Sequence, residues 1–405
     1  MIAMAGSLFA PADSARAVAQ VYSVSLLATA PLAAALAAAT LARRAPAGTR
    51  ALVWRCAIIA LLLICVGRWL PVHWIAWVVP DALASPLVAL GRVQMALDRV
   101  AMPPGPSTGA ARVIGDLAAL YWAGVVAVLI PVAFGWWQAR RAVRRSRPPG
   151  DACWDSLLDE VRAALHVSRR PEVRVSAGDG VPLACGTIRP VVLLPAPAGD
   201  WSDTRRRAVL LHEVAHVAAA DVAFTLAGQV VCALLWFHPG AWWAARRLRE
   251  ESELACDDRV LHAGIRASDY AALLADTAAA CCGSRRAAAA ARTLVRRTGL
   301  RARLAAIVVP HDTHAPARTA LLGTTCLTLA LAAPLGVVRL APTPQVLTKL
   351  MQDTRWESRA YAVTGLAQRT DTVAVARAAA TDDPSPRVRA WAALALGTGR
   401  TQPPR

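Results

Sequence analysis

Four uncharged apolar runs divide the chain. They cover residues 21–42, 56–66, 117–137 and 320–338. A helix of about 20 apolar residues crosses the roughly 30 Å hydrocarbon layer of a bilayer. The pattern therefore predicts a mainly α, multi-pass membrane protein with four transmembrane helices. Three of them form an N-terminal membrane region at 1–137, and the fourth lies at 319–339.

The segment 138–318, between the third and fourth runs, has the pattern of a soluble α+β domain. Residues 154–165 have the spacing of an amphipathic helix, and 172–175 that of a short strand. Residues 181–195 predict a pair of strands joined around Gly186. We expect one compact domain between the third and fourth spans.

The C-terminal segment 343–405 repeats with a period of thirty residues. Asp353 recurs as Asp383 and Arg359 as Arg389, and the apolar residues around them keep helical spacing. Such a period is typical of paired helices in an α-solenoid, and the second copy resembles a HEAT-like repeat helix. Fewer than two full repeats fit, too few for a solenoid that is stable alone. We expect this tail to pack on the proline-rich exterior loop at 80–112, on a second copy of the chain in a homodimer, or on a partner or ligand.

Charge patterning orients the spans. The formal net charge of +18 comes almost wholly from arginine, since Lys349 is the only lysine. Arginines cluster at 43–55 and at 140–147, just after the first and third spans, which places both segments in the cytoplasm. The peptide between the third and fourth spans is then cytoplasmic, and both termini lie outside a plasma (cytoplasmic) membrane.

The basic run at 140–147 also suits contact with anionic membrane lipids. A nucleic-acid partner would explain a basic chain too. However, arginines that follow apolar runs favour a membrane, so we expect no direct contact with nucleic acid.

The run His212-Glu213-Val214-Ala215-His216 carries the clearest chemical signal. Two histidines four residues apart on a helix share one face and can reach one zinc ion, and the glutamate between them lies beside the open coordination position. The pattern predicts a zinc peptidase in which Glu213 is the general base. The alternative is that this five-residue pattern occurs by chance. A third metal ligand elsewhere in the chain would disfavour that alternative.

Glu253 is the predicted third ligand, on a second helix that also carries Asp257 four residues later. Catalytic zinc sites use three protein ligands and keep one position open. Asp257 can accept the other ring N–H of a ligating histidine, which fixes its tautomer. The predicted site is therefore Zn²⁺ held by His212, His216 and Glu253, with Asp257 in support.

A fifth apolar run, residues 222–245, lies between the two metal-binding motifs. It cannot span the membrane if one ion joins residues on both sides of it. Pro239-Gly240 provides a break, so we expect a helical hairpin that dips into the membrane interface. The site should then lie close to the bilayer.

Further motifs accompany the metal pattern in a fixed order. They are Gly186 to Pro195, the metal-binding run with Asp221, Phe237-His238-Pro239 with Trp242-Trp243, Glu253 with Ala255-Cys256-Asp257, and Tyr270-Ala271. Together they resemble the BlaR/MecR-type integral-membrane zinc peptidases, antibiotic-sensing receptors and relatives among the thermolysin-like gluzincins. The resemblance covers about residues 20–340. It implies a cytoplasmic gluzincin-type peptidase domain with the metal ligands, base and supporting carboxylate named above.

The resemblance also implies how a substrate is held. A substrate peptide would add to an edge strand that contains Val191, Val192 and Leu193. The group that stabilises the oxyanion is not evident. Candidates for oxyanion or substrate contacts are His262, Tyr270 and His238, each with a structural role as the favoured alternative.

The sensor half departs from the family. A penicillin-binding sensor needs a Ser-x-x-Lys nucleophile, but Val346 stands three residues before the sole lysine, Lys349. The sequence therefore excludes a β-lactam sensor of the acylated kind.

The favoured hypothesis is an integral-membrane zinc endopeptidase with a signal-transducing role, which cleaves a cytoplasmic protein. A transcriptional repressor as the target is implied by the resemblance alone. One alternative is a housekeeping membrane-protein peptidase without signal input. Another is a non-catalytic membrane scaffold that binds through the repeat tail. Structural zinc sites usually use four protein ligands, and the three found here disfavour the scaffold.

Overall fold

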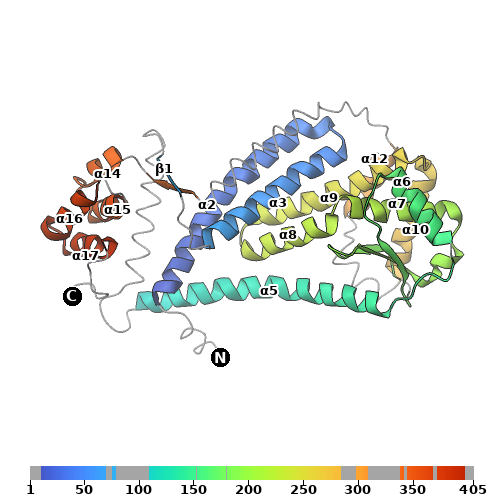
Figure 1. Ribbon diagram of the computed structural model, residues 1–405, viewed down its shortest axis with the longest axis horizontal. Helices are drawn as coiled ribbons and strands as arrows, with labels where there is room; N and C mark the ends of the chain where they lie inside the picture. Colours follow the sequence, from blue (N-terminus) through green and yellow to red (C-terminus); the bar gives the residue numbers. More distant parts are fainter. Residues whose placement is uncertain are drawn as a thin grey trace. The chain divides into compact units, whose positions relative to one another are not determined.

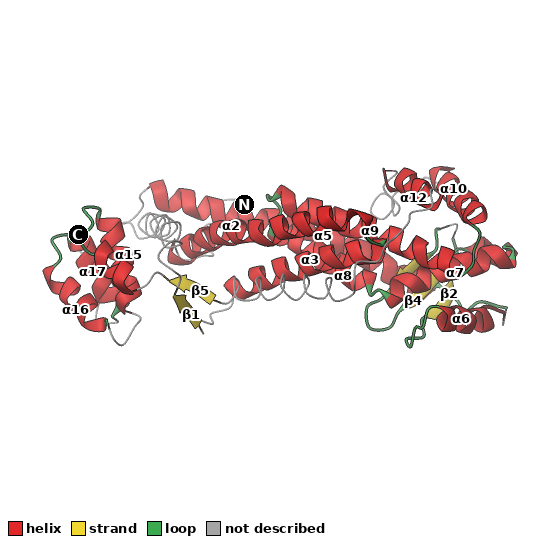
Figure 2. Ribbon diagram, turned by 90° about the horizontal axis from the view of Figure 1, so that it is seen from above, coloured by secondary structure: helices red, strands yellow, loops and turns green. Residues whose placement is uncertain are grey.

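The computed structural model describes residues 11–69, 75–78, 109–151, 153–178, 180–283, 298–308, 338–341, 344–367 and 372–396, which are mostly helical (Figures 1 and 2). The helices of the larger part are α2 (Pro11–Leu41), α3 (Ala47–Trp69), α5 (Gly109–Arg145), α6 (Cys153–Ala164), α7 (Asp203–Ala218), α8 (Asp221–Leu234), α9 (Pro239–His262), α10 (Ala267–Gly283) and α12 (Thr298–Val308). The C-terminal helices are α14 (Pro344–Leu350), α15 (Trp356–Ala367), α16 (Val373–Asp382) and α17 (Pro386–Ala395). The strands are β1 (Ile75–Val78), β2 (Glu172–Val175), β3 (Leu183–Cys185), β4 (Val191–Leu194) and β5 (Val338–Ala341).

Contacts divide the chain into two compact units, which we describe separately. One unit consists of Met1–Ala28, Leu63–Gly124 and Ala332–Arg405, and the other of Thr29–Leu62 and Val125–Leu331. The candidate site lies wholly in the second unit.

Among the described residues, two helical segments are long and apolar enough to cross a membrane. They are Ala47–Gly67 in α3 and Gly115–Arg145 in α5. Both extend beyond the apolar runs at 56–66 and 117–137, because each helix continues through flanking polar residues. The chain is therefore a candidate for at least two membrane crossings.

The other two predicted spans are not among these candidate segments. The run 21–42 coincides with the C-terminal part of α2, which is not one of the two segments above. The run 320–338 lies outside the described residues except at its end, where Val338 begins β5. Strand β5 pairs in parallel with β1. The topology with four spans stays a prediction.

A three-stranded sheet and α6 support helix α7 (Figure 2). The sheet order is β2-β4-β3, with β2 parallel to β4 and β3 antiparallel to it. The predicted strands at 172–175 and 181–195 are thus confirmed. Gly186 begins the turn between β3 and β4 with φ +84°, a backbone conformation that favours glycine.

The predicted edge strand is wrong. Val191, Val192 and Leu193 belong to β4, the central strand, which has neighbours on both sides. All four β4 side chains are buried, as expected for a strand covered on both faces. The edge that lies against α7 is β3.

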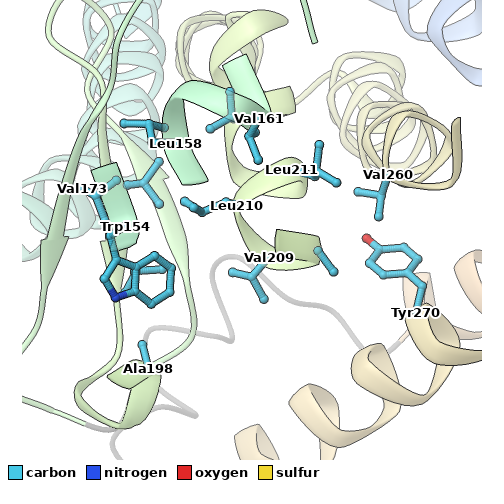
Figure 3. Close-up of a cluster of buried hydrophobic side chains, with 14 of the residues drawn as sticks. Trp154, Leu158, Val161, Val173, Ala198, Val209, Leu210, Leu211, Val260 and Tyr270 are labelled. Carbon is cyan, nitrogen blue, oxygen red and sulfur yellow. The ribbon is translucent and has the colours of Figure 1, made fainter. Parts of the chain in front are cut away.

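One hydrophobic core joins these elements (Figure 3). Trp154 and Leu158 of α6 pack with strand residues and with α7. On the other side of the cluster, Tyr270 of α10 lies beside Val260 of α9. The core therefore fixes α7, α9 and α10, the helices that carry the candidate chemistry.

Helices α8 and α9 form the predicted hairpin, with Pro239 as the first residue of α9. The hairpin packs along α3: the rings of Trp54 and Trp243 meet edge to face at 4.9 Å between centroids. Near the tip, a Cβ added to Gly240 would lie 2.8 Å from a methyl group of Leu32 in α2. A helical hairpin is confirmed, whereas its insertion into the membrane stays a prediction.

The C-terminal tail has its own hydrophobic core from α14 to α17. The thirty-residue period corresponds to the same pair of hydrogen bonds, which recurs before α15 and before α17. The Oδ1 atom of Asp353 accepts a hydrogen bond from the backbone N–H of Arg355, and the Asp353 carbonyl accepts one from Arg359. Asp383 and Arg389 repeat both contacts before α17.

The turn at Gly186 gives a test of the sheet. A Cβ at this position would lie 2.3 Å from the Arg189 carbonyl oxygen, so Gly186→Ala should cost about 1–3 kcal/mol of stability. Gly264→Ala is the control, because Gly264 also has a positive φ, of +91°, but nothing lies within 4 Å of an added Cβ. Thermal unfolding of the full chain in detergent should show the larger loss for Gly186→Ala. Equal losses would contradict this packing.

Candidate metal centre

Helix α7 presents His212 and His216 on one face. Its first turn is capped by Ser202, whose Oγ lies 3.4 Å from the backbone nitrogen of Arg205. The Nε2 atoms of the two histidines lie 3.2 Å apart. The spacing of four residues thus aims both nitrogens at one point, as predicted.

Glu253 of α9 completes the set. Its Oε2 lies 3.6 Å from His212 Nε2, and its Oε1 lies 3.7 Å from His216 Nε2. The three ligand atoms all lie within 4.8 Å of one another. Two imidazole nitrogens and one carboxylate oxygen are the donors of a catalytic zinc site, so these residues fit that ion.

Asp221, the first residue of α8, supports His216. Its Oδ2 lies 2.8 Å from His216 Nδ1, the ring nitrogen that faces away from the three-donor set. Ala220 enables this contact: its left-handed backbone, with φ +54°, bends the chain so that α7 and α8 meet at 57°. Sequence reasoning included Asp221 only in the family motif and gave it no role.

Two further side chains hold Asp221 in place. Arg55 Nη2 donates to Asp221 Oδ1 at 2.6 Å, and Ser252 Oγ donates to the same oxygen at 3.0 Å. Neither contact was predicted. In the sequence, Arg55 is one of several arginines at 43–55, and Ser252 is notable only as the neighbour of Glu253.

His212 has a matching arrangement on its other side. Asp257 Oδ1 lies 3.4 Å from His212 Nδ1, where a supporting carboxylate was predicted. The Tyr270 hydroxyl lies 3.0 Å from the same nitrogen and donates to Asp257 Oδ1 at 2.6 Å. Tyr270 therefore helps to orient His212 and lies on the side away from Nε2, which does not suit an oxyanion contact.

Arg303 of α12 ties two of these carboxylates together. Its Nε and Nη2 donate to Asp257 at 2.7 Å each, and its Nη1 lies 2.9 Å from Glu253 Oε2. At the sequence level Arg303 was only one of many arginines. Its role depends on α12 folding back onto α9 and α10.

These contacts keep the carboxylates ionised. Dehydration would raise the pKa of Glu253, but the hydrogen bond from His212 and the charges of His216 and Arg303 outweigh it and hold that pKa well below the usual range. Burial likewise would raise the pKa of Asp257, and hydrogen bonds from His212 and Arg303 lower it. The site thus contains ionised carboxylates, whose negative charge favours the binding of a cation.

Glu213 is buried on α7, with an exposed fraction of 8%. It lies close enough to β3 for its charge to act on Cys185. Burial, and then the charge of Glu213, raise the pKa of the Cys185 thiol to about 11. The predicted general base therefore lies on the helix of the two candidate ligands, near the edge strand β3.

The other two candidates for oxyanion or substrate contacts lie elsewhere. His262 is exposed at the end of α9, where its Nδ1 lies 2.6 Å from the Asp258 carbonyl oxygen. His238 immediately precedes the same helix, fifteen residues before Glu253. At 1.5 Å per residue this separation is about 22 Å, so His238 cannot reach the donors.

A second set of donors shares His216. His216 Nδ1, Asp221 and Cys256 also lie within 4.8 Å of one another. However, Asp221 and Cys256 are both buried, and Arg55 and Ser252 already occupy one oxygen of the carboxylate. A metal there would have no open position, so we assign the ion to the set that includes Glu253.

Comparison with known proteins decides the family. A family model described as BlaR1 peptidase M56 matches residues 19–307, which include the whole metal centre. The chain belongs to this family. Membership indicates a membrane metallopeptidase. A second model, for HEAT repeats, matches residues 343–404 and confirms the repeat predicted for the tail.

A similar curated protein is the regulatory protein BlaR1 of Bacillus licheniformis. It is 31% identical over 80 residues, which cover 20% of this chain and 13% of that protein. The alignment thus spans a small part of the relative. It supports the family assignment but does not show the activity or the targets of this M56 family member.

Removal of Glu253 tests the ligand set. Glu253→Ala should lower bound zinc from about one ion per chain to almost none, because two histidines alone hold the ion weakly. Glu250→Ala is the control, since Glu250 lies on the same helix and its ion pairs among the described residues are with Arg246 and Arg247. Elemental analysis of folded, detergent-purified protein measures both. Zinc retained in Glu253→Ala would contradict the assignment.

Proposed function

We propose that this M56 family member is an integral-membrane zinc endopeptidase of the gluzincin type. One observation carries the proposal: His212, His216 and Glu253 converge, and a carboxylate holds the far nitrogen of each histidine. Such support fixes the tautomer that leaves Nε2 free to bind a metal. A structural site would usually close with a fourth protein ligand.

Each side chain has a role in peptide hydrolysis. Zinc, when bound, would supply Lewis-acid chemistry that polarises the peptide carbonyl and activates water. Glu213 would accept the proton of the attacking water and pass it to the leaving amine. Asp221 and Asp257 would keep the histidines oriented, and Arg303 would hold Asp257 and Glu253 together.

The sheet offers a place for the substrate backbone. Strand β3 is an edge strand and lies against α7, so an extended peptide can add to it with backbone hydrogen bonds. Its scissile bond would then pass close to Glu213, the neighbour of β3. This position replaces the edge predicted at Val191, Val192 and Leu193.

The site is proposed to face the cytoplasm at the membrane surface. The arginines at 43–55 and 140–147 support this orientation, because basic residues beside spans stay on the cytoplasmic side. Both termini and the repeat tail would then lie outside the plasma membrane. Lipids would contact α5 and the outer side of α3, and the exposed apolar residues Ile130 and Phe134 of α5 suit that contact.

A signalling role is the favoured biological context. A tail of HEAT repeats on one side of a membrane and a peptidase on the other can link an exterior ligand or partner to cleavage of a cytoplasmic protein, such as a transcriptional repressor. A peptidase without signal input is the second candidate. Deletion of 343–405 separates the two, because only a signalling enzyme should change its cleavage rate in membranes when the tail is absent.

The catalytic test is Glu213→Gln. This change keeps the size of the side chain and removes the base, so peptide cleavage should fall about 10²–10⁴-fold while bound zinc remains near one ion per chain. Cleavage of a mixed peptide library, followed by mass spectrometry, measures the activity. Asp258→Asn is a control, since the Asp258 carboxyl accepts a hydrogen bond from the backbone of Ala47 and is not one of the donors. Equal cleavage by wild type and Glu213→Gln would contradict the mechanism.

A further inference from the structure

Helix α3 contacts the metal centre through a charged side chain. Arg55 lies in the candidate span Ala47–Gly67, yet its side chain is only 15% exposed and donates to Asp221. Its guanidinium also lies over the ring of Phe224, 5.1 Å from the centroid. A buried charge is costly unless it is paired, so the pairing of Arg55 with Asp221 points to a function for this side chain.

Through Asp221, Arg55 is linked to His216, one of the proposed metal ligands. Arg55 binds Oδ1 of Asp221, and His216 Nδ1 lies beside Oδ2 of the same carboxylate. With both oxygens engaged, the carboxylate cannot rotate without breaking one contact. The position of α3 thereby sets the angle of the His216 ring, and the Nε2 atom of that ring faces the metal set.

We propose that Arg55 is a positioning residue of the metal centre, which makes α3 an essential part of the zinc site and couples any movement of α3 to zinc affinity. The proposal rests on the zinc-binding function proposed above. It adds that the segment 138–318 lacks one component of its own site. A signal that shifts or rotates α3 would then weaken or restore the site through Asp221.

The same helix provides a matched control. Arg50 Nε donates to Glu251 at 2.8 Å, and Glu251 is only 3% exposed. This pair also joins α3 to the hairpin. Glu251 is held by Arg247 as well, and its described hydrogen bonds reach no metal donor. Loss of Arg50 should therefore loosen the interface without reaching His216.

The experiment measures zinc affinity of the full chain in detergent by competition with a chelator. Arg55→Gln should weaken zinc binding about 10–100-fold, the usual effect of losing a group that orients a ligand. Asp221→Asn should weaken it similarly, and the double variant should be no weaker than Asp221→Asn alone, because the two residues act in series. Arg50→Gln should stay within about threefold of wild type.

A second measurement reports ligand geometry directly. Co²⁺ in place of zinc gives visible absorption bands that depend on the arrangement of its ligands. Arg55→Gln should alter these bands, whereas Arg50→Gln should leave them unchanged. Thermal unfolding without metal measures the structural cost of each variant, which should be similar because each removes one buried ion pair.

Three outcomes would overturn the proposal. They are unchanged zinc affinity in Arg55→Gln, equal weakening in Arg55→Gln and Arg50→Gln, and additive losses in the double variant. If Arg55→Gln does not fold, Arg55→Lys decides. It keeps the charge but not the planar guanidinium, and it should bind zinc at least about threefold more weakly than wild type. A wild-type protein that binds no zinc would instead refute the proposed function.

Discussion

The metal centre depends on two carboxylates that lie behind its histidines. Asp221 holds His216 and Asp257 holds His212, so each ring keeps its Nε2 directed at the common point. Buried carboxylates are unfavourable unless they are paired. Arg55 pairs with Asp221, and Arg303 pairs with Asp257. These arginines belong to α3 and α12, which lie near the two ends of the matched family sequence. The site therefore requires the fold on both sides of α7.

This arrangement explains why the hydrophobic core lies where it does. The core beneath α7 fixes the helix that carries both histidines, and Tyr270 extends from that core to His212 and Asp257. On the other side, the hairpin of α8 and α9 packs on α3 through Trp54 and Trp243. The peptidase site thus joins a soluble sheet and a helix that meets the criteria for a membrane span. Such a junction is suited to an enzyme whose activity responds to events in the membrane.

Local periodicity made the central part of the site predictable. The spacing of four residues places His212 with His216 and Glu253 with Asp257, and the repeated entry at Asp353 and Asp383 gives the tail its period. The partners Arg55 and Arg303 could not be predicted, because they depend on tertiary contacts. The position of β4 is a different case: the family resemblance implies an edge strand, whereas the uninterrupted run Val191-Val192-Leu193-Leu194 is itself typical of a central strand. His238 and His262 stayed open candidates, with a structural role favoured, because their separation from Glu253 depends on the length of α9.

X-ray absorption spectroscopy at the zinc edge tests the account most directly, because the structure contains two sets of donors that share His216. A metal bound by His212, His216 and Glu253 should show only nitrogen and oxygen neighbours, at about 2.0–2.2 Å. A metal bound by His216, Asp221 and Cys256 would show a sulfur neighbour at about 2.3 Å. A shell of light atoms with two imidazoles is the result we predict. A sulfur neighbour in the wild-type protein would contradict the proposed peptidase centre.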